Sequence, residues 1–179
     1  GVSPINDQNR ELKAALEAEL ARRGIELPVL WGNRNWHPYL SEALTEAHER
    51  GFTKLIAIGT SAYSSYSSCR QYREDYAQAL EDTGLTDVIQ IDKVRQFFDH
   101  PGFVAPFIEG VQRALAEIAA RGVAPEQTHV LFSTHSIPTP DAQRRGPRDR
   151  DCVEGGAYAA QHLAVAGVVM AAASAGRVA

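Results

Sequence analysis

The chain alternates short apolar runs with segments whose apolar residues recur every three or four positions. The runs have the length and composition of buried strands. The predicted strands are Pro28–Gly32, Lys54–Gly59, Thr86–Ile91 and Val130–Phe132. Alternation of strands and helices joined by short turns predicts an α/β fold, with a parallel sheet covered by helices on both faces.

Helices are predicted where apolar residues fall on one face of a 3.6-residue period. Gly24 and Gly51 each follow such a stripe and mark its end, because glycine tolerates the left-handed conformation that often terminates a helix. The predicted helices are Asn6–Arg23, Pro38–Gly51, Cys69–Leu80, Val104–Arg121 and Glu154–Ala175. The polar stretch Pro138–Asp151 is expected to be a loop.

Composition narrows the class of protein. The 179 residues carry a net charge of −4 and no dominant basic patch, which argues against a nucleic-acid partner. The apolar stretch Leu163–Ala175 is too short to cross a bilayer, so no membrane span is expected. Cys69 and Cys152 are too few for a disulfide framework, which favours a reducing, cytoplasmic setting.

The chain opens on Gly1 without a methionine and closes in an Ala/Gly-rich helix, so we expect an interior piece of a longer protein.

The stretch Thr128–Pro138, with sequence THVLFSTHSIP, carries the first candidate for chemistry. Its apolar run breaks into hydroxyl residues around His135, which would place that side chain at the carboxyl edge of a strand. Open α/β sheets bind their ligands at this edge. A neutral imidazole there can bind a borderline metal ion or accept a proton, although an isolated histidine more often fills a gap in a loop. The other histidines are expected to lie on the surface or to pack: His37, His48, His100, His129 and His162.

A serine hydrolase is the competing interpretation of serine next to histidine. Ser136 is adjacent to His135 and cannot readily serve as its nucleophile, and the chain has no G-x-S-x-G motif. The metal and dinucleotide motifs H-E-x-x-H, C-x-x-C and G-x-G-x-x-G are also absent from the sequence.

The second candidate is Ser61–Tyr72, with sequence SAYSSYSSCRQY. Composition alone favours a solvated serine-rich loop. Tyrosines at regular spacing instead favour a site for a flat conjugated ligand, because their rings stack while their hydroxyls bind polar groups. Arg70 could bind a ligand carboxylate through both arms of its guanidinium. Cys69 is either a small packing residue or a metal ligand.

These segments together resemble the ferrochelatases, most closely the actinobacterial coproporphyrin type. The matching stretches are GVSPINDQNR at Gly1–Arg10, GNRNWHPY at Gly32–Tyr39, TSAYSSYSSCRQYRE at Thr60–Glu74 and FSTHSIP at Phe132–Pro138. The resemblance implies a chelatase fold of two Rossmann-like lobes with parallel sheets flanked by helices, incomplete in this chain. Residues 1–92 would form the first lobe without its N-terminal strand, and residues 93–179 a connector and part of the second lobe.

The resemblance further implies insertion of Fe2+ into a porphyrin in haem biosynthesis, either coproporphyrin III or protoporphyrin IX. It implies that His135 is catalytic and handles the Fe2+ substrate, and that Ser3 and Tyr72 contact the porphyrin. It makes Cys69 a candidate ligand of a [2Fe–2S] cluster in the full-length protein, and it gives Cys152 no role.

The resemblance also sets limits on this chain. The family's catalytic glutamate and its other cluster cysteines belong to a half that the chain lacks, so the chain alone is expected to be inactive. The full-length protein is expected to be a monomer. A porphyrin- or metal-binding module without insertase activity is the alternative. An acidic residue facing His135 would discriminate the two, and the sequence does not reveal one.

Overall fold

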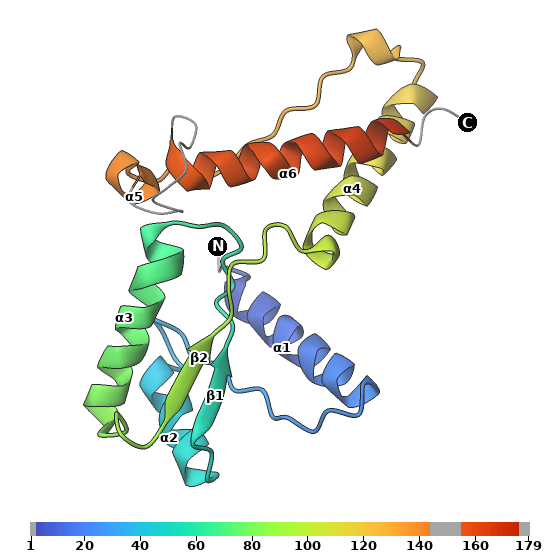
Figure 1. The fold of residues 1–179 in the computed structure, drawn as a ribbon. Coiled ribbons are helices and arrows are strands. Elements are labelled where there is room, and N and C mark those ends of the chain that lie inside the picture. Colours follow the sequence, from blue (N-terminus) through green and yellow to red (C-terminus); the bar gives the residue numbers. More distant parts are fainter. Residues whose placement is uncertain (1–2, 144–154, 176–179) are drawn as a thin grey trace. The chain divides into compact units, whose positions relative to one another are not determined.

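A computed structural model describes residues 3–143 and 155–175 (Figure 1). The helices are α1 (Ile5–Arg22), α2 (Leu40–Glu49), α3 (Tyr66–Thr83), α4 (Pro101–Ala120), α5 (Thr139–Gln143) and α6 (Gly156–Ala175), with a 3-10 helix, η1, at Pro125–Gln127. The chain divides into two compact units. The first unit combines Gly1–Ala57 with Glu74–Asp92, and the second combines Ile58–Arg73 with Lys93–Ala179. The lobes expected at residues 1–92 and 93–179 stay a prediction.

The sheet consists of two neighbouring strands, β1 (Lys54–Ala57) and β2 (Gln90–Lys93), connected through α3. The strands are parallel and flanked by helices, which confirms the predicted α/β class. The N–H of Gln90 donates a 2.8 Å hydrogen bond to the carbonyl of Thr53, just before β1. A crossover helix between adjacent strands is the arrangement that parallel pairing requires.

The core of the first unit lies between α2, α3 and one face of the sheet. Its buried residues are Leu44, Ala47, Ala79, Leu85 and Ile89. Leu55 of β1 and Ile91 of β2 pack against this cluster. Ile56, whose side chain alternates to the other face, is 68% exposed. α1 contributes no buried residue, so helix packing in the first unit is concentrated on one face of the sheet.

The strand predicted at Pro28–Gly32 is wrong. This segment is irregular, and the nearby pairing is a single bridge between Asn33 and Tyr39. Gly32 lies so close to α2 that a Cβ atom there would stand 2.8 Å from the Cα of Leu40. The short apolar run therefore packs beside a helix and has no strand to pair with among the described residues.

The second unit is built around the packing of α4 on α6 (Figure 1). Val104 of α4 and Val165 and Val169 of α6 are buried together. Several partly buried residues pack against these valines: Tyr63, Phe98, Phe103, Ile108 and Val111. The loop after β1 therefore contributes an aromatic side chain to a core formed mainly by two helices.

The strand predicted at Val130–Phe132 is also wrong. The residues around it have no regular secondary structure, and Leu131 is 91% exposed and Phe132 44% exposed. A strand is stabilised by hydrogen bonds to a neighbour, and the described residues of this unit provide none for this segment. Part of the expected loop, Thr139–Gln143, forms the short helix α5.

The sequence predicted no membrane span, because the apolar run Leu163–Ala175 is too short. α6 is longer than this run. By length and composition its 20 residues could cross a membrane. Core helices of soluble proteins can have the same length and composition, so these features do not assign α6 to a membrane. In this structure α6 buries small and branched residues, several of them against α4 and α5. They are Ala157, Val165, Val169 and Ala173.

Candidate functional site

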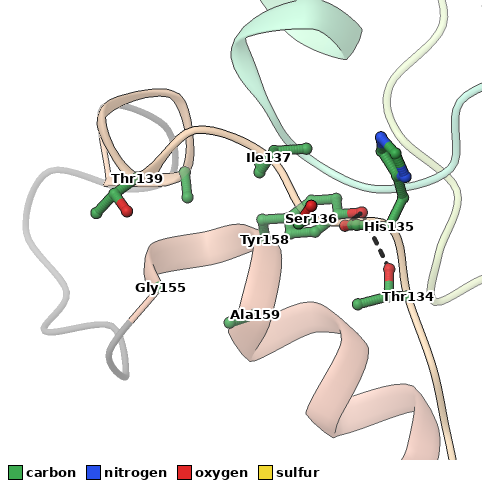
Figure 2. Close-up of a pocket in the computed structure, with 9 residues that line it drawn as sticks. Thr134, His135, Ser136, Ile137, Thr139, Gly155, Tyr158 and Ala159 are labelled. Atoms are coloured by element: carbon green, nitrogen blue, oxygen red, sulfur yellow. Dashed lines mark hydrogen bonds between the residues drawn. The ribbon is translucent and has the colours of Figure 1, made fainter.

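His135 lies in an extended segment that passes the start of α6 (Figure 2). An open cavity of about 330 Å³, which we call the His135 pocket, adjoins this segment. Its lining residues are Thr134, His135, Ser136, Ile137, Thr139, Ala142, Gly155, Tyr158 and Ala159. The side chains of Thr134 and His135 extend to opposite sides of the segment (Figure 2). His135 is exposed, so its imidazole is open to a ligand.

A hydrogen-bond network fixes this segment to α6. The hydroxyl of Tyr158 donates to the carbonyl of His135 at 3.0 Å and lies 3.0 Å from the hydroxyl of Thr134. The hydroxyl of Thr134 is 2.9 Å from Nε2 of His162. Nδ1 of His162 is 2.7 Å from the carbonyl of Tyr158. Because a carbonyl only accepts, Nδ1 carries a proton, and in the neutral ring Nε2 accepts from Thr134. Each hydroxyl has a single proton, so in this arrangement the Thr134 and Tyr158 oxygens are close neighbours with no proton of their own between them.

Tyr63 joins the loop after β1 to the same part of α6. Its ring stacks on His162, with 3.6 Å between ring centroids, and meets Tyr158 edge to face at 6.3 Å. Phe98 and Phe103 lie on its other sides, at centroid distances of 6.2 and 6.0 Å. Partial burial, with a smaller contribution from Tyr158, raises the pKa of the Tyr63 phenol. The tyrosine that follows β1 is therefore part of the core of the second unit.

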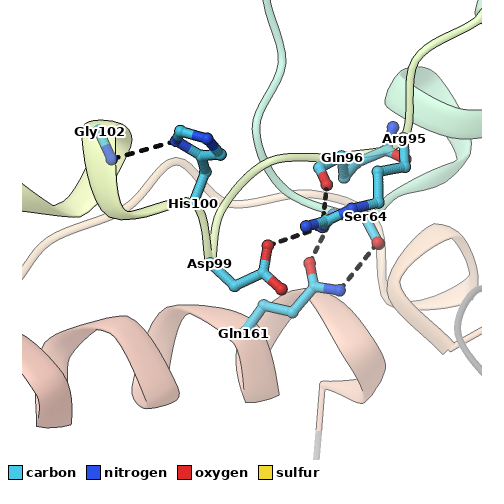
Figure 3. Close-up of polar contacts among 7 residues, drawn as sticks. All are labelled: Ser64, Arg95, Gln96, Asp99, His100, Gly102 and Gln161. Carbon is cyan, nitrogen blue, oxygen red and sulfur yellow. Dashed lines mark hydrogen bonds and ion pairs between the residues drawn. The ribbon is translucent and has the colours of Figure 1, made fainter.

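Side-chain amides anchor the loop that carries Tyr63 (Figure 3). Gln161 of α6 accepts from the N–H of Ser64 at 2.7 Å and donates to the Ser64 hydroxyl at 2.8 Å. Gln96 donates to the carbonyl of Ser68 at 2.8 Å. Arg95 pairs with Asp99 at 2.7 Å, and this hydrogen bond lowers the pKa of the Asp99 carboxyl. Two segments distant in sequence are thus held against α6 and the start of α3.

The serines of Ser61–Tyr72 act as a helix cap. Ser65 precedes α3, and its hydroxyl accepts from the N–H of Ser68 at 3.1 Å. The hydroxyl of Ser68 accepts in return from the N–H of Ser65 at 2.8 Å and donates to the carbonyl of Tyr63 at 2.5 Å. This is a reciprocal capping box with serine at both positions. It explains why α3 begins at Tyr66, before the predicted start at Cys69, and why two serines are buried.

Cys69 and Tyr72 lie on the first turns of α3. The thiol of Cys69 is half-buried and lies 3.8 Å from the Ser68 hydroxyl. The ring of Tyr72 packs over Gly59, where an added Cβ would be 3.4 Å from the ring. Lys93 is partly buried beside Cys69 and Arg73. Burial lowers the pKa of Lys93, the charge of Arg73 lowers it slightly further, and a negative charge on Cys69 would act in the opposite direction.

Ser3 and Cys152 are the remaining residues that the sequence analysis discussed. Ser3 belongs to the first unit, is exposed, and accepts a 3.4 Å hydrogen bond from the N–H of Ile5 at the start of α1. Cys152 lies outside the described residues. Within residues 3–143 and 155–175, no group of three or more His, Cys, Asp or Glu side chains is placed to hold a metal ion.

Sequence reasoning missed Tyr158 and did not connect His162 with His135. Both partners lie on the last helix, four residues apart, and therefore share a face of it. That spacing was the available signal. It could not indicate that the helix returns to the histidine segment, because hydrogen bonds across 23 and 28 residues depend on the tertiary fold.

The structure is thus an α/β protein in which the segment that carries His135 is hydrogen-bonded to α6. The ferrochelatase family model matches residues 1–178, and the chain belongs to the ferrochelatase family. It is 70% identical to the coproporphyrin III ferrochelatase of Leifsonia xyli, over 94% of this chain and 46% of that relative. Proteins of the same name from Tropheryma whipplei and Streptomyces coelicolor are 58% and 51% identical. The chain spans less than half the length of these relatives.

Proposed function

We propose that this chain contributes to a ferrochelatase that inserts ferrous iron into a porphyrin during haem biosynthesis. The support is its match to the family over residues 1–178 and its identity with relatives named coproporphyrin III ferrochelatase. Coproporphyrin III is the porphyrin we expect, with protoporphyrin IX as the second choice. Fe2+ enters as a substrate.

The observation that carries the proposal within this structure is the exposed imidazole of His135 on the F-S-T-H-S-I-P segment. Metal insertion requires the loss of two pyrrole protons and removal of water from the incoming ion. A histidine beside the macrocycle can accept a proton or bind the ion during this exchange. His135 is suited to either task, because its carbonyl is fixed by Tyr158 while its ring remains open to a ligand.

The other assignments belong to the same proposal. Ser3 and Tyr72 would contact the porphyrin, Ser3 from the start of α1 and Tyr72 from α3. The full-length protein would be a cytoplasmic monomer without a nucleic-acid partner. Cys69 would be a ligand of a [2Fe–2S] cluster. Such clusters need four protein ligands, and the described residues provide a single cysteine, so the residues present here do not form a cluster site.

The second candidate function is a porphyrin- or metal-binding module without insertase activity. It is favoured by one observation: the nine residues that line the His135 pocket include no aspartate or glutamate. A carboxylate opposite the histidine would help to remove pyrrole protons. In an insertase, that group would have to come from a residue other than these nine.

The test is to supply the full-length protein with Fe2+ under anaerobic conditions and with either coproporphyrin III or protoporphyrin IX. Loss of free-porphyrin fluorescence reports metallation. Turnover of coproporphyrin III, at a higher kcat/KM than protoporphyrin IX, is the expected result. Tight porphyrin binding without turnover would support the binding module.

A further inference from the structure

The main chain around His135 makes one described hydrogen bond. Between His129 and Ile137, within the described residues, its hydrogen bond is the one that the carbonyl of His135 accepts from Tyr158. Since this segment forms no sheet ladder, strand pairing does not fix its peptide planes. The Tyr158 hydroxyl therefore restrains the peptide plane that follows His135, and with it the backbone from which the imidazole extends.

The position of Tyr158 is itself fixed by contacts along α6. Its backbone carbonyl accepts from His162 one turn later on α6, and the two rings are 4.3 Å apart. Gln161, between them, makes two hydrogen bonds to Ser64. Val165 and Val169, further along α6, are buried against α4. Tyr158 thus transmits the position of a packed helix to an exposed segment.

Thr134 couples the two anchors. Its hydroxyl lies 3.0 Å from the Tyr158 hydroxyl and 2.9 Å from Nε2 of His162. The side chain on one side of the segment is therefore fixed to α6, while the next side chain, His135, extends to the other side (Figure 2). A side chain without a hydroxyl at position 134 would remove the polar group that lies beside the Tyr158–His135 hydrogen bond.

We propose that Tyr158 is a positioning residue for His135, acting through the His135 carbonyl with Thr134 and His162 as its supports. The inference rests on the proposed function, because it assumes that the direction of the His135 imidazole matters for iron insertion. Preorganised geometry of this kind raises the rate of the chemical step more than it strengthens substrate binding. Tyr158 does not need to touch the porphyrin for this role.

The decisive variant is Tyr158→Phe in the full-length protein, which keeps the ring against His162 and removes the hydroxyl. We expect kcat for iron insertion to fall about tenfold, as for the loss of one well-placed hydrogen bond. KM for the porphyrin should stay within about twofold, since the variant changes no contact that binds the substrate equally in the ground state and the transition state. A fall in kcat/KM caused entirely by KM would overturn the proposal.

Thr134 provides a second variant with a matched control. Thr134→Val should reproduce the loss in kcat, whereas Thr134→Ser, which keeps the hydroxyl, should restore it. Thr128→Val removes a hydroxyl from the same segment, but one that donates to the carbonyl of Ala124. It should leave activity unchanged. Equal losses from Thr134→Val and Thr128→Val would show that the segment is merely destabilised, and would refute the positioning role.

A spectroscopic readout separates this proposal from the proposed function. The imidazole resonances of His135 can be followed by NMR in histidine-labelled protein and assigned by their loss in His135→Gln. They should shift or broaden in Tyr158→Phe and Thr134→Val, and remain unchanged in Thr128→Val. Unchanged His135 resonances in Tyr158→Phe would overturn the proposal. If the unmodified protein inserts no iron, the proposed function fails, and the resonances still decide whether Tyr158 positions His135.

Discussion

The phenol ring of Tyr63 stacks on the imidazole of His162, with 3.6 Å between centroids and 16° between ring planes. Tyr63 comes from the serine-rich segment after β1 and His162 from the middle of α6. The contact therefore joins one of the two chemically suggestive stretches of the sequence to the helix that holds the other.

Tyr63 should ionise at higher pH than an exposed tyrosine, because burial raises its pKa above the ordinary value of 10.0. A group whose pKa is raised on folding binds its proton more tightly in the folded state. Its contribution to stability is complete below pH 10 and is lost as the pH rises through the folded pKa. The difference in phenolate absorbance between the protein and Tyr63→Phe should therefore appear above pH 10. A transition at or below pH 10 would contradict this.

Val169 should be the most sensitive position of the α4–α6 interface, because it is completely buried. Val169→Ala should lower the free energy of unfolding by roughly 1–3 kcal/mol, through lost burial and a residual cavity. Val168→Ala is the matched control, since Val168 is on the same helix and is 55% exposed. It should change stability by less than about 0.5 kcal/mol. Chemical denaturation of both variants measures the difference, and equal effects would argue against this packing.

The sequence predicted the helices better than the strands, for a physical reason. A helix satisfies its own backbone, so stripes and glycine stops place it locally, and Gly24 and Gly51 indeed adopt positive φ after α1 and α2. A strand depends on a neighbour, and this dependence explains why Pro28–Gly32 and Val130–Phe132 remain unpaired. The predicted Thr86–Ile91 strand shifted to Gln90–Lys93 because its first residues turn back onto Leu85 at the end of α3.

The sequence likewise pointed to some residues of the candidate site and not to others. Motif and resemblance led to His135, Cys69, Tyr72 and Ser3, whose roles stay predictions. The Ser65–Ser68 cap could have been recognised from serines three residues apart before a helix. Tyr158 could not, because its importance arises from a hydrogen bond to a backbone carbonyl 23 residues away. The four-residue spacing of Tyr158 and His162 places them on one helix face, but it does not reveal contacts that follow from the tertiary fold.

His135→Ala in the full-length protein should abolish iron insertion while the fold is retained. Loss of a general acid or base typically costs about a hundredfold or more in rate. Porphyrin metallation and far-UV circular dichroism, measured together, check both parts. His129→Ala is the control, since it removes an exposed histidine from the same segment. Activity of His135→Ala within about threefold of the unmodified protein would exclude a catalytic role.

Cys69 should bind iron only where further thiolates complete the site. A [2Fe–2S] cluster takes four protein ligands, so the 179-residue chain, with two cysteines, should be colourless when purified. The full-length protein should show visible charge-transfer absorption with stoichiometric iron and sulfide, and Cys69→Ser should remove it. Absorption that persists in Cys69→Ser would refute the assignment of Cys69 as a ligand.

The last prediction is that the 179-residue chain by itself lacks chelatase activity and self-associates. The described residues that line the His135 pocket provide no carboxylate to work with the histidine. Leu131 is 91% exposed and Phe132 44% exposed on a segment without a strand partner. Unpaired backbone and exposed apolar side chains are the features through which protein chains associate.

Activity with Fe2+ and coproporphyrin III, together with elution from a sizing column, tests both parts. The chain should turn over at most a small fraction of the substrate that the full-length protein converts, and it should elute as more than one species. Leu131→Lys should reduce self-association, because a charge at an unpaired edge opposes pairing with a second chain. It should not restore activity, since it adds no acid beside His135. Turnover equal to that of the full-length protein would mean that these residues already contain the complete catalytic set.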